Sequence, residues 1–289
     1  MPGRSRSPVE RYHDRVAGLY DGIYDGDPYW EAVFSLTWRN ILRHLPRNAA
    51  SRCLDVGCGT GRWGLRLARS GYAVDFLDIS QKMLDQAAAK LAAIGGEGVQ
   101  LDCLGAALRK ETELRPGGGL FWHASLDDLS PLPGNSYDFI VGQGDALNCA
   151  EKPGRSFKEL ARLLKPGGVM LLSVDNRLQG MRQYLRTGDA AGLEEFLRSG
   201  LTRWITDVPE ERYPITMFTP GQIRAMCRTR KLELLGLIGK TVLPLRQFKE
   251  LLAVPEKREI LLRLEESLHG EEALLGNAPH LEFAARKTA

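Results

Sequence analysis

Residues 54–62, with the sequence LDVGCGTGR, restrict the folds open to this chain more than any other segment. An apolar run that reads as a strand leads into three glycines at alternate positions, and an amphipathic helix pattern follows over residues 61–69. Open α/β sheets bind nucleotides and related ligands at glycine-rich turns of this kind, between a buried strand and a helix. The segment therefore predicts parallel strands with a ligand at this turn.

The glycine spacing limits the choice of ligand. A dinucleotide-binding turn would carry its third glycine where Arg62 stands, whereas here the glycine falls one residue earlier, at Gly61. Asp55, two residues ahead of Gly57, would repel a pyrophosphate bound at the helix N-terminus. Asp55 suits a ligand that carries a positive charge, such as an ammonium or a sulfonium group.

Short apolar runs alternate with amphipathic helix patterns along the rest of the chain. Such alternation is typical of a mostly parallel sheet with helices on both faces. Thr219 and Pro220 supply the cap and the first residue of one of these helices. We predict strands over residues 53–56, 73–78, 137–142, 168–174, 232–238 and 280–287, and helices over residues 61–69 and 80–93, around 157–164 and after 219.

Two helices are predicted ahead of this alternation, and we assign residues 1–46 to an N-terminal tail with cap helices. Apolar residues at helical spacing predict one helix over residues 16–24 and a second that ends at Pro46. The Arg-rich start lacks the apolar core of a secretory signal and is expected to be a short disordered tail. The main domain, residues 47–289, contains three predicted insertions: 95–120, 177–215 and 245–270.

Two of these insertions have an expected role. The polar helical segment 177–215 follows the carboxyl end of a strand, where ligands bind in open sheets, so we predict a substrate lid. In the segment 245–270, Ile260, Leu264 and Leu268 form one apolar stripe. Packing on the same domain is the expected use of this stripe, and a homodimer face is the alternative.

Composition and charge exclude several classes of protein. The 289 residues carry a formal net charge of +3, spread along the chain rather than gathered in blocks, so the charge does not argue for a nucleic-acid partner. No apolar run approaches the roughly eighteen residues needed to cross a bilayer. The five cysteines form no C-x-x-C pair, as is typical of reduced core cysteines. We expect a cytoplasmic protein without a membrane span.

The segment LDVGCGTG resembles the first motif of the class I S-adenosylmethionine-dependent methyltransferases, and the core is similar to that of quinone methyltransferases. The resemblance runs over about residues 51–174 and more loosely to the last strand. It implies a Rossmann-like, doubly wound, seven-stranded sheet, mostly parallel with an antiparallel last strand. It also implies S-adenosylmethionine as cofactor and S-adenosylhomocysteine as product. Its first motif places Asp55, Gly57, Cys58, Gly59 and Gly61 at the cofactor.

Asp78 ends the next strand, in VDFLDIS. The resemblance implies that its carboxylate accepts hydrogen bonds from both ribose hydroxyls. A helix begins at Ser80, so capping of that helix is a second and compatible role for Asp78. The resemblance also places Ile79 against the adenine and Met83 one turn later, at a position that is apolar in the family.

Further cofactor positions follow from the same resemblance. Ser125, next to Leu126, stands where the family usually places an acid near the adenine amine, and its hydroxyl can still form a hydrogen bond. His123, just before it, is interpreted as a histidine satisfied at a strand end. Gln143 follows the strand after which cofactor and substrate meet. Tyr20 belongs to the N-terminal helices, which in similar enzymes fold over the cofactor.

A metal site is a possible alternative at the ends of two strands. Metal-dependent catechol O-methyltransferases place an Asp after strand four and an Asp-Asn pair after strand five. Asp145, Asp175 and Asn176 would form such an all-oxygen Mg²⁺ site. However, Gln143 occupies the slot that matches the first Asp. We therefore expect no metal requirement and interpret these residues as a polar strand end that caps the lid segment.

The sequence does not single out a catalytic residue. Methyl transfer depends mainly on positioning and desolvation, and a general base is needed only where the acceptor carries a proton at neutral pH. Tyr24, Asp145 and His13 are the candidates. Tyr24 is expected to line the methyl pocket, with plain helix packing as the alternative.

Three functions remain in competition. A small-molecule methyltransferase is favoured because aromatic-rich N-terminal helices and a lid would enclose a compact substrate. The segment after strand four, VGQGDALN, lacks the Asn/Asp-Pro-Pro-Tyr/Phe signature of amino-directed DNA and RNA methyltransferases. An RNA or protein methyltransferase is therefore supported only by the mild basic charge and by lid arginines. A non-catalytic protein that binds S-adenosylmethionine would have no need for both Asp55 and Asp78. The lid arginines are Arg182, Arg186, Arg198 and Arg203.

Overall fold

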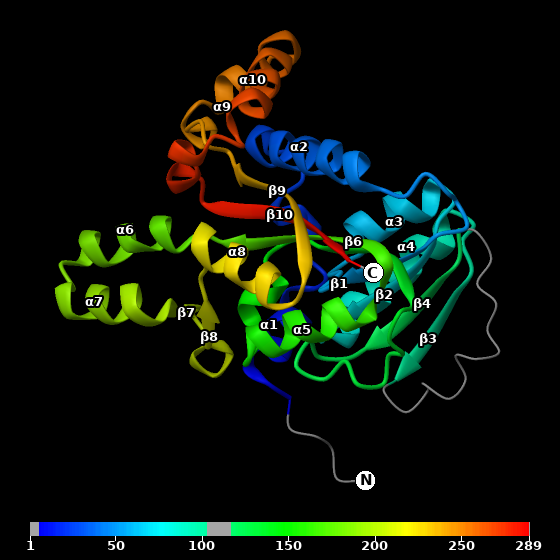
Figure 1. The fold of residues 1–289 in the computed structure, drawn as a ribbon. Coiled ribbons are helices and arrows are strands. Elements are labelled where there is room, and N and C mark those ends of the chain that lie inside the picture. The colour runs from blue at the N-terminus through cyan, green and yellow to red at the C-terminus, as the bar shows by residue number, and fades with distance from the viewer. Residues whose placement is uncertain (1–5, 103–116, 289) are drawn as a thin grey trace.

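A computed structural model describes residues 6–102 and 117–288 and contains one large sheet between two layers of helices (Figure 1). The strand order is β3-β4-β2-β1-β5-β6-β10-β9, and all pairings are parallel except those of β10 with β6 and β9. The predicted Rossmann-like sheet with an antiparallel last strand is confirmed, and β3 adds a further strand at one edge. The strands are β1 (Arg52–Val56), β2 (Ala73–Asp78), β3 (Gly98–Asp102), β4 (Gly119–His123), β5 (Tyr137–Gly142), β6 (Leu164–Asp175), β9 (Leu232–Lys240) and β10 (His280–Lys287).

The two faces of the sheet are buried under different helices. One face packs against α5 (Pro153–Leu163) and α8 (Pro220–Thr229) through residues such as Phe157 and Ile223. The other packs against α3 (Arg62–Arg69), α4 (Gln81–Ala93) and α2 (Pro28–His44), through residues that include Ile41, Leu67 and Leu84. Cover on both faces explains why the central strands are continuous apolar runs rather than alternating ones.

The N-terminal helix lies earlier in the chain than predicted. Helix α1 spans Pro8–Val16, within the segment expected to be a tail, whereas residues 17–24 form turns and the short helix η1 (Asp21–Ile23). The Ser7 side chain accepts a hydrogen bond from the backbone N of Glu10, and Pro8 opens the helix. Gly18 and Gly22 weaken any helix over residues 16–24. The second predicted helix is confirmed as α2, which ends at His44.

The three predicted insertions have different structures. Most of the segment 95–120 lies outside the described residues, apart from β3 and the start of β4. The segment 177–215 forms two helices that project away from the sheet, followed by a hairpin that turns back toward it (Figure 1). These elements are α6 (Arg177–Thr187), α7 (Ala190–Ser199), β7 (Leu201–Trp204), η4 (Pro209–Glu211) and β8 (Tyr213–Thr216).

The third insertion packs on α2 and is fixed by a buried acid. It contains η5 (Leu245–Gln247), α9 (Lys249–Leu252) and α10 (Pro255–Leu268), and η6 (Glu272–Asn277) follows before β10. Buried Glu265 accepts hydrogen bonds from the backbone N of Val242 at 2.6 Å and of Leu243 at 3.0 Å.

The predicted packing of the apolar stripe on α10 is wrong. Ile260 and Leu264 are each 48% exposed, and the helix instead buries Leu262 against the residues of α2 and α9. The spacing of the apolar residues correctly predicted a helix, but it did not predict which face of that helix is buried. Among the described residues, no helix is long and apolar enough to cross a membrane.

Candidate active site

The glycine turn after β1 has a left-handed backbone that favours glycine. Gly57, Gly59 and Gly61 have φ values of 60°, 53° and 87°. A Cβ added to Gly57 would lie 2.3 Å from the Cβ of Ala146, and one added to Gly61 would lie 2.9 Å from the Cβ of Ala87. The backbone of the turn therefore packs closely against Ala146 and Ala87. Gly57, Cys58 and Gly59 line the adjoining cavity.

Asp78 ties this turn to the next helix. Its Oδ2 accepts a hydrogen bond from the backbone N of Gly59 at 2.8 Å, and its Oδ1 accepts one from the backbone N of Ser80 at 2.9 Å. Ser80 in turn caps α4 by accepting from the backbone N of Met83. Burial raises the pKa of Asp78, against the opposing effect of His13, these N–H donors and His123. The carboxylate thus sits at the glycine turn, as the sequence predicts, while the cap itself is Ser80.

Asp55 lies beneath the turn rather than in the cavity. The carboxylate is fully buried, and its Oδ2 accepts a hydrogen bond from the backbone N of Gly64 at 2.7 Å. Its Oδ1 lacks a hydrogen-bond partner within the described part of the chain. Burial raises the pKa of Asp55 to about 7. In this structure Asp55 joins β1 to α3, and its predicted pairing with the amino group of the cofactor stays a prediction.

The predicted adenine side of the site is closed by α1. Met83 is fully buried against Val16 and Ala17, and the Ser80 hydroxyl donates a hydrogen bond to Asp14 at 2.6 Å. Ile79, Ser125 and Leu126 lie at the ends of β2 and β4, outside the walls of the cavity. Their adenine contacts, like that of Met83, stay predictions.

A cavity of about 410 Å³ opens from the glycine turn toward the ends of β5, β6, β9 and β10. Aromatic side chains form part of its walls, and the ring centroids of Tyr20 and Tyr24 lie 5.3 Å apart, with Trp30 5.0 Å from Tyr24. His13 also lines the cavity, and its Nδ1 lies 2.9 Å from the carbonyl O of Val9. The aromatic residues of the wall are Tyr12, Tyr20, Tyr24, Trp30, Phe34, Trp63, Trp204 and Tyr213.

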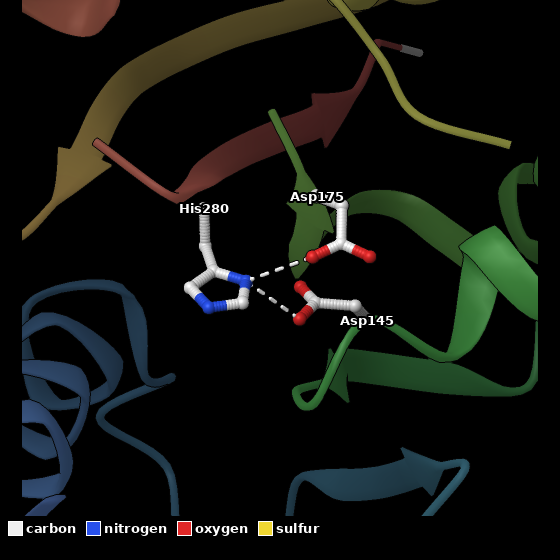
Figure 2. A group of neighbouring side chains, drawn as sticks. All are labelled: Asp145, Asp175 and His280. Carbon is white, nitrogen blue, oxygen red and sulfur yellow. Dashed lines mark ion pairs between the residues drawn. The ribbon is translucent and has the colours of Figure 1, made fainter. Parts of the chain in front are cut away.

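Two carboxylates and a histidine meet at the far end of this cavity (Figure 2). His280 Nδ1 lies 2.8 Å from Asp145 Oδ2 and 3.2 Å from Asp175 Oδ1. The three residues come from the start of β10, the turn after β5 and the end of β6, and β10 pairs His280 directly with Asp175. Asp145 has a φ of 63°, so the turn holds a strained residue at this position.

The charges of this group are interdependent. Burial alone would lower the pKa of His280, but Asp145 and Asp175 raise it to about 10. Burial would raise the pKa of Asp145, but His280 and Lys240 hold it below its usual value. Burial and the neighbouring Asp145 raise the pKa of Asp175. The geometry therefore favours an imidazolium between two carboxylates.

The structure does not assemble the alternative metal site as predicted. Asn176 is fully buried, and its Nδ2 donates to the carbonyl O atoms of Leu275 and Ala278, at 2.8 Å each. Its Oδ1 accepts from the backbone N of Leu178, because Asn176 caps α6. His280 takes the third place beside Asp145 and Asp175, with one potential ligand atom from each residue within 4.8 Å of the others.

Gln143 belongs to a polar chain behind the same end of the cavity. Lys240 Nζ donates to Gln143 Oε1 at 2.6 Å and lies 3.0 Å from Glu282 Oε2, while Glu282 Oε1 accepts from Asn40 Nδ2 at 2.6 Å. Lys240 and Gln143 both line the cavity. This chain connects α2 and β10 to the predicted meeting point of cofactor and substrate.

Several wall residues were missed by sequence reasoning, His280 and Lys240 above all. An antiparallel last strand begins at the edge where its parallel neighbours end, so its first residue, His280, belongs to the site. The predicted antiparallel last strand therefore already indicated that its first residue would lie at the site. Trp204 and Tyr213 reach the wall from the β7–β8 hairpin, so only this part of the predicted lid borders the cavity.

The chain matches known methyltransferases in sequence. A methyltransferase domain model matches residues 54–172. A demethylmenaquinone methyltransferase of Geobacillus kaustophilus strain HTA426 is 30% identical over 185 residues, which cover 61% of this chain and 67% of that protein. A ubiquinone biosynthesis O-methyltransferase of Caulobacter vibrioides is 28% identical over 212 residues, 71% of each chain. A third relative is a protein of Geobacillus sp. strain WCH70 that is named as a methyltransferase, and it is 28% identical over 167 residues. These residues make up 56% of this chain and only 57% of that relative.

Solved structures share the fold. An S-adenosylmethionine-dependent methyltransferase from Methanosarcina mazei superposes with a TM-score of 0.56 at 18% identity, covering 86% of this chain and 97% of its own. The [4+2]-cyclase SpnF superposes with a TM-score of 0.60 at 19% identity, covering 100% of this chain and 98% of its own. At these identities the likeness shows the fold alone. Together with the sequence matches and the glycine turn, it places the chain in the class I S-adenosylmethionine-dependent methyltransferase family.

Proposed function

We propose that this protein transfers the methyl group of S-adenosylmethionine to a small-molecule acceptor. One observation carries the proposal: the glycine turn opens directly into a cavity of about 410 Å³ with aromatic walls. A cavity of this kind holds a compact substrate away from water, next to the place where the family binds its cofactor. The glycine turn also connects the proposal to the family, because it carries the glycines of the first motif that the chain shares with that family.

The residues present fit the cofactor. The positive φ values of Gly57 and Gly59 and the unpaired Oδ1 of buried Asp55 leave backbone and acceptor groups unfilled beside the cavity. Asp78 would hold the ribose, and Cys58, Gly59 and Gly61 would shape the turn around the methionine part. When bound, the cofactor supplies an electrophilic methyl group. The protein orients the acceptor and excludes water, which are the main requirements of this reaction.

The acceptor is proposed to be a small molecule because the site is a cavity of about 410 Å³ and the named relatives act on small molecules. Demethylmenaquinone and ubiquinone methyltransferases are both among them. An RNA or protein substrate would need an open basic groove. Three of the lid arginines considered for that role (Arg182, Arg186 and Arg198) lie on α6 and α7, which project away from the sheet (Figure 1). Arg203 lies on β7.

The remaining assignments are also proposals. We place the protein in the cytoplasm, in keeping with the free thiols of Cys53, Cys58, Cys149 and Cys227. A homodimer through the exposed side of α10, at Ile260 and Leu264, remains a proposal to be tested by the mass of the protein in solution. No metal requirement is proposed.

The test uses S-adenosylmethionine labelled on its methyl group. Purified protein is incubated with desalted host extract and the small-molecule fraction of that extract, and Asp78→Asn serves as the blank. Label is then counted in organic-soluble, aqueous small-molecule, RNA and protein fractions. Label in a small-molecule fraction is the expected result, and label confined to RNA or protein would contradict it. Cofactor binding by calorimetry without any transfer would indicate a non-catalytic protein instead.

A further inference from the structure

The two ring nitrogens of His280 face different surroundings. Nδ1 points at the carboxylates of Asp145 and Asp175, 2.8 Å and 3.2 Å away. The other nitrogen points away from both acids (Figure 2). The acids come from two different elements, and both hold the ring by short ion-pair contacts, although neither contact meets the angular criteria of a hydrogen bond. A positioned ring nitrogen is therefore presented to the cavity that His280 lines.

The presented nitrogen carries a hydrogen. Two carboxylates at one imidazole favour its doubly protonated form, because loss of the proton would leave Lys240, which also pairs with Glu282, as the nearby cation for both acids. The charged groups that face His280 are Asp145, Asp175 and Lys240, the last being its cross-strand partner on β9. Nε2–H is therefore a donor from a cation, and such donors bind oxygen most strongly when the oxygen is itself charged.

Other cations line the same cavity. Lys240 uses one N–H on Gln143 and approaches Glu282 with a second, which leaves its third donor for a ligand. Arg62 and Arg246 also line the cavity, and Arg62 forms an ion pair with Asp25 at 2.8 Å. Close by, Asn148 is buried, and its amide N and O lack a hydrogen-bond partner among the described residues. These groups are suited to a polar, negatively charged part of a ligand.

We propose that His280 binds the methyl acceptor through Nε2–H and that the acceptor is bound as an oxygen anion. This inference rests on the proposed function and names the chemistry of the acceptor atom: an ionisable hydroxyl, such as that of a phenol or an enol. Its O–H bond breaks with the electron pair left on oxygen, and the proton leaves to solvent. No general base is then needed in the site. Asp145 and Asp175 act through His280 and are positioning residues.

The proposal excludes an ammonium acceptor. A protonated amine would lie beside the imidazolium of His280 and the ammonium of Lys240, both of which would repel it. The aromatic walls accept a planar ring, which would stack on Tyr24 or Trp30 while its oxygen reaches the polar end. The shape and the charge of the cavity therefore favour the same class of acceptor.

The test measures ionisation of a bound probe rather than turnover. 4-Nitrophenol and 4-nitrocatechol are titrated with protein that is saturated with S-adenosylhomocysteine, at a pH one unit below the solution pKa of each probe. The phenolate absorbance is expected to grow as wild-type protein is added. His280→Gln is expected to weaken phenolate binding by about tenfold or more, because a neutral donor replaces a cationic one. His44→Gln, a substitution at the distant end of α2, is the matched control and should bind as wild type.

Two further measurements separate a binding role from a structural one. The ¹⁵N shifts of the His280 ring should show an imidazolium at neutral pH in the wild type, and Asp145→Asn should weaken both that signal and phenolate binding. Calorimetry with S-adenosylhomocysteine should give the same affinity for the wild type, His280→Gln and His44→Gln.

Several results would overturn the proposal. These are a wild-type protein that yields no phenolate signal with either probe, an equal signal in His280→Gln, or a neutral ring. Phenolate binding that disappears with EDTA and returns with Mg²⁺ would replace His280 with a metal ion. A wild-type protein that fails to bind S-adenosylhomocysteine would instead contradict the proposed function, so the two failures are distinguishable.

Discussion

The two ends of the cavity differ in how far apart their residues lie in the chain. The cofactor end is built by a loop and a strand end that are close in sequence, from Gly57 to Asp78. The acceptor end brings together Asp145, Asp175 and His280, whose contacts span more than a hundred residues. The first end is fixed by backbone conformation and backbone hydrogen bonds, and the second by charged side chains.

This difference has a consequence for specificity. A turn that needs glycine at three positions tolerates little change, so its ligand is set by the fold. A cluster of side chains at strand ends can change residue by residue without disturbing the sheet, because it lies at the edge where loops begin. Within one family fold, the acceptor end is therefore where one substrate class is exchanged for another.

The largest expected effect is at the cofactor end. Asp78→Asn removes the charge that accepts the backbone N–H groups of Gly59 and Ser80 and that would hold the ribose. Hydrogen bonds to charged groups contribute about 1.5–3 kcal/mol each, so binding of S-adenosylhomocysteine should weaken on the order of 100-fold. Calorimetry measures the loss, and Asp85→Asn, an exposed acid on α4, should be silent. Equal binding by Asp78→Asn would mean that the turn needs no acid.

A second prediction uses pH to examine the acceptor end. His280 has a folded pKa of about 10, above the ordinary value of 6.5, so its ion pairs stabilise the protein fully below pH 6.5. That stabilisation is lost as the pH rises toward 10. The difference in unfolding free energy between wild type and His280→Gln should therefore shrink by about 2 kcal/mol from pH 7 to pH 9. Urea titrations at each pH give this difference.

His44 provides a control of opposite sign for this measurement. Burial lowers the pKa of His44, so its protonation opposes folding at low pH and does nothing at high pH. The difference in unfolding free energy between wild type and His44→Gln should stay constant from pH 7 to pH 9. If the difference from wild type shrank equally for His280→Gln and His44→Gln, then some group other than Asp145, Asp175 and His280 would titrate between pH 7 and pH 9.

The same contrast explains what could be predicted from the sequence. The glycine turn after β1 and the position of Asp78 at the end of β2 could be read from the sequence, because each depends on a short local pattern. The cofactor contacts assigned to Gly57, Gly59 and Asp78 stay predictions. His280 was missed, although the antiparallel last strand was expected, because strand order had to be combined with the direction of that strand. Asn176 caps α6, as expected of a polar strand end that caps the lid segment. Its hydrogen bonds to Leu275 and Ala278 join residues about a hundred positions apart, which the sequence does not show.

The predictions of where a helix begins and of which face it buries were wrong for another reason. Apolar residues at helical spacing predicted a helix over residues 16–24, but the Ser7 cap and Pro8 start α1 earlier and the glycines end it. On α10, the apolar stripe faces solvent, and the buried acid Glu265 lies on the inward side. In both segments, polar hydrogen bonds decided the outcome against the apolar pattern.

A third prediction isolates the steric constraint at the glycine turn. Gly57→Ala would place a Cβ 2.3 Å from the Cβ of Ala146, whereas Gly71→Ala meets no atom within 4 Å, although its φ of 90° is also positive and is no more favourable for alanine than the 60° of Gly57. Both variants bear the cost of a positive φ, but only Gly57→Ala also displaces η3 (Ala146–Cys149). We expect Gly57→Ala to be less stable than Gly71→Ala by about 1–2 kcal/mol in urea titration. Equal stabilities would show that the turn has room to relax.

The smallest expected effect concerns the contact between α1 and the β7–β8 hairpin, which cover the two ends of the cavity. Arg15 on α1 contacts Glu211 in the β7–β8 hairpin, with Nε 2.9 Å and 2.8 Å from the two carboxylate oxygens. The hairpin supplies Trp204 and Tyr213 to the cavity wall, and α1 covers the predicted adenine side, so this ion pair holds both covers together. Because Arg15 is exposed to solvent, the contact is weak. Arg15→Ala should speed release of S-adenosylhomocysteine only about two- to fivefold, as followed by tryptophan fluorescence after rapid dilution.

Arg69→Ala on α3, away from the cavity, is the control for this last substitution and should leave the release rate unchanged. Unchanged release in Arg15→Ala as well would mean that the covers open independently. Each end of the cavity would then admit its own ligand without regard to the other. A release rate that rises more than tenfold would mean the opposite: the acceptor-side hairpin would govern access to the cofactor, and the two ends, built so differently, would operate as one gate.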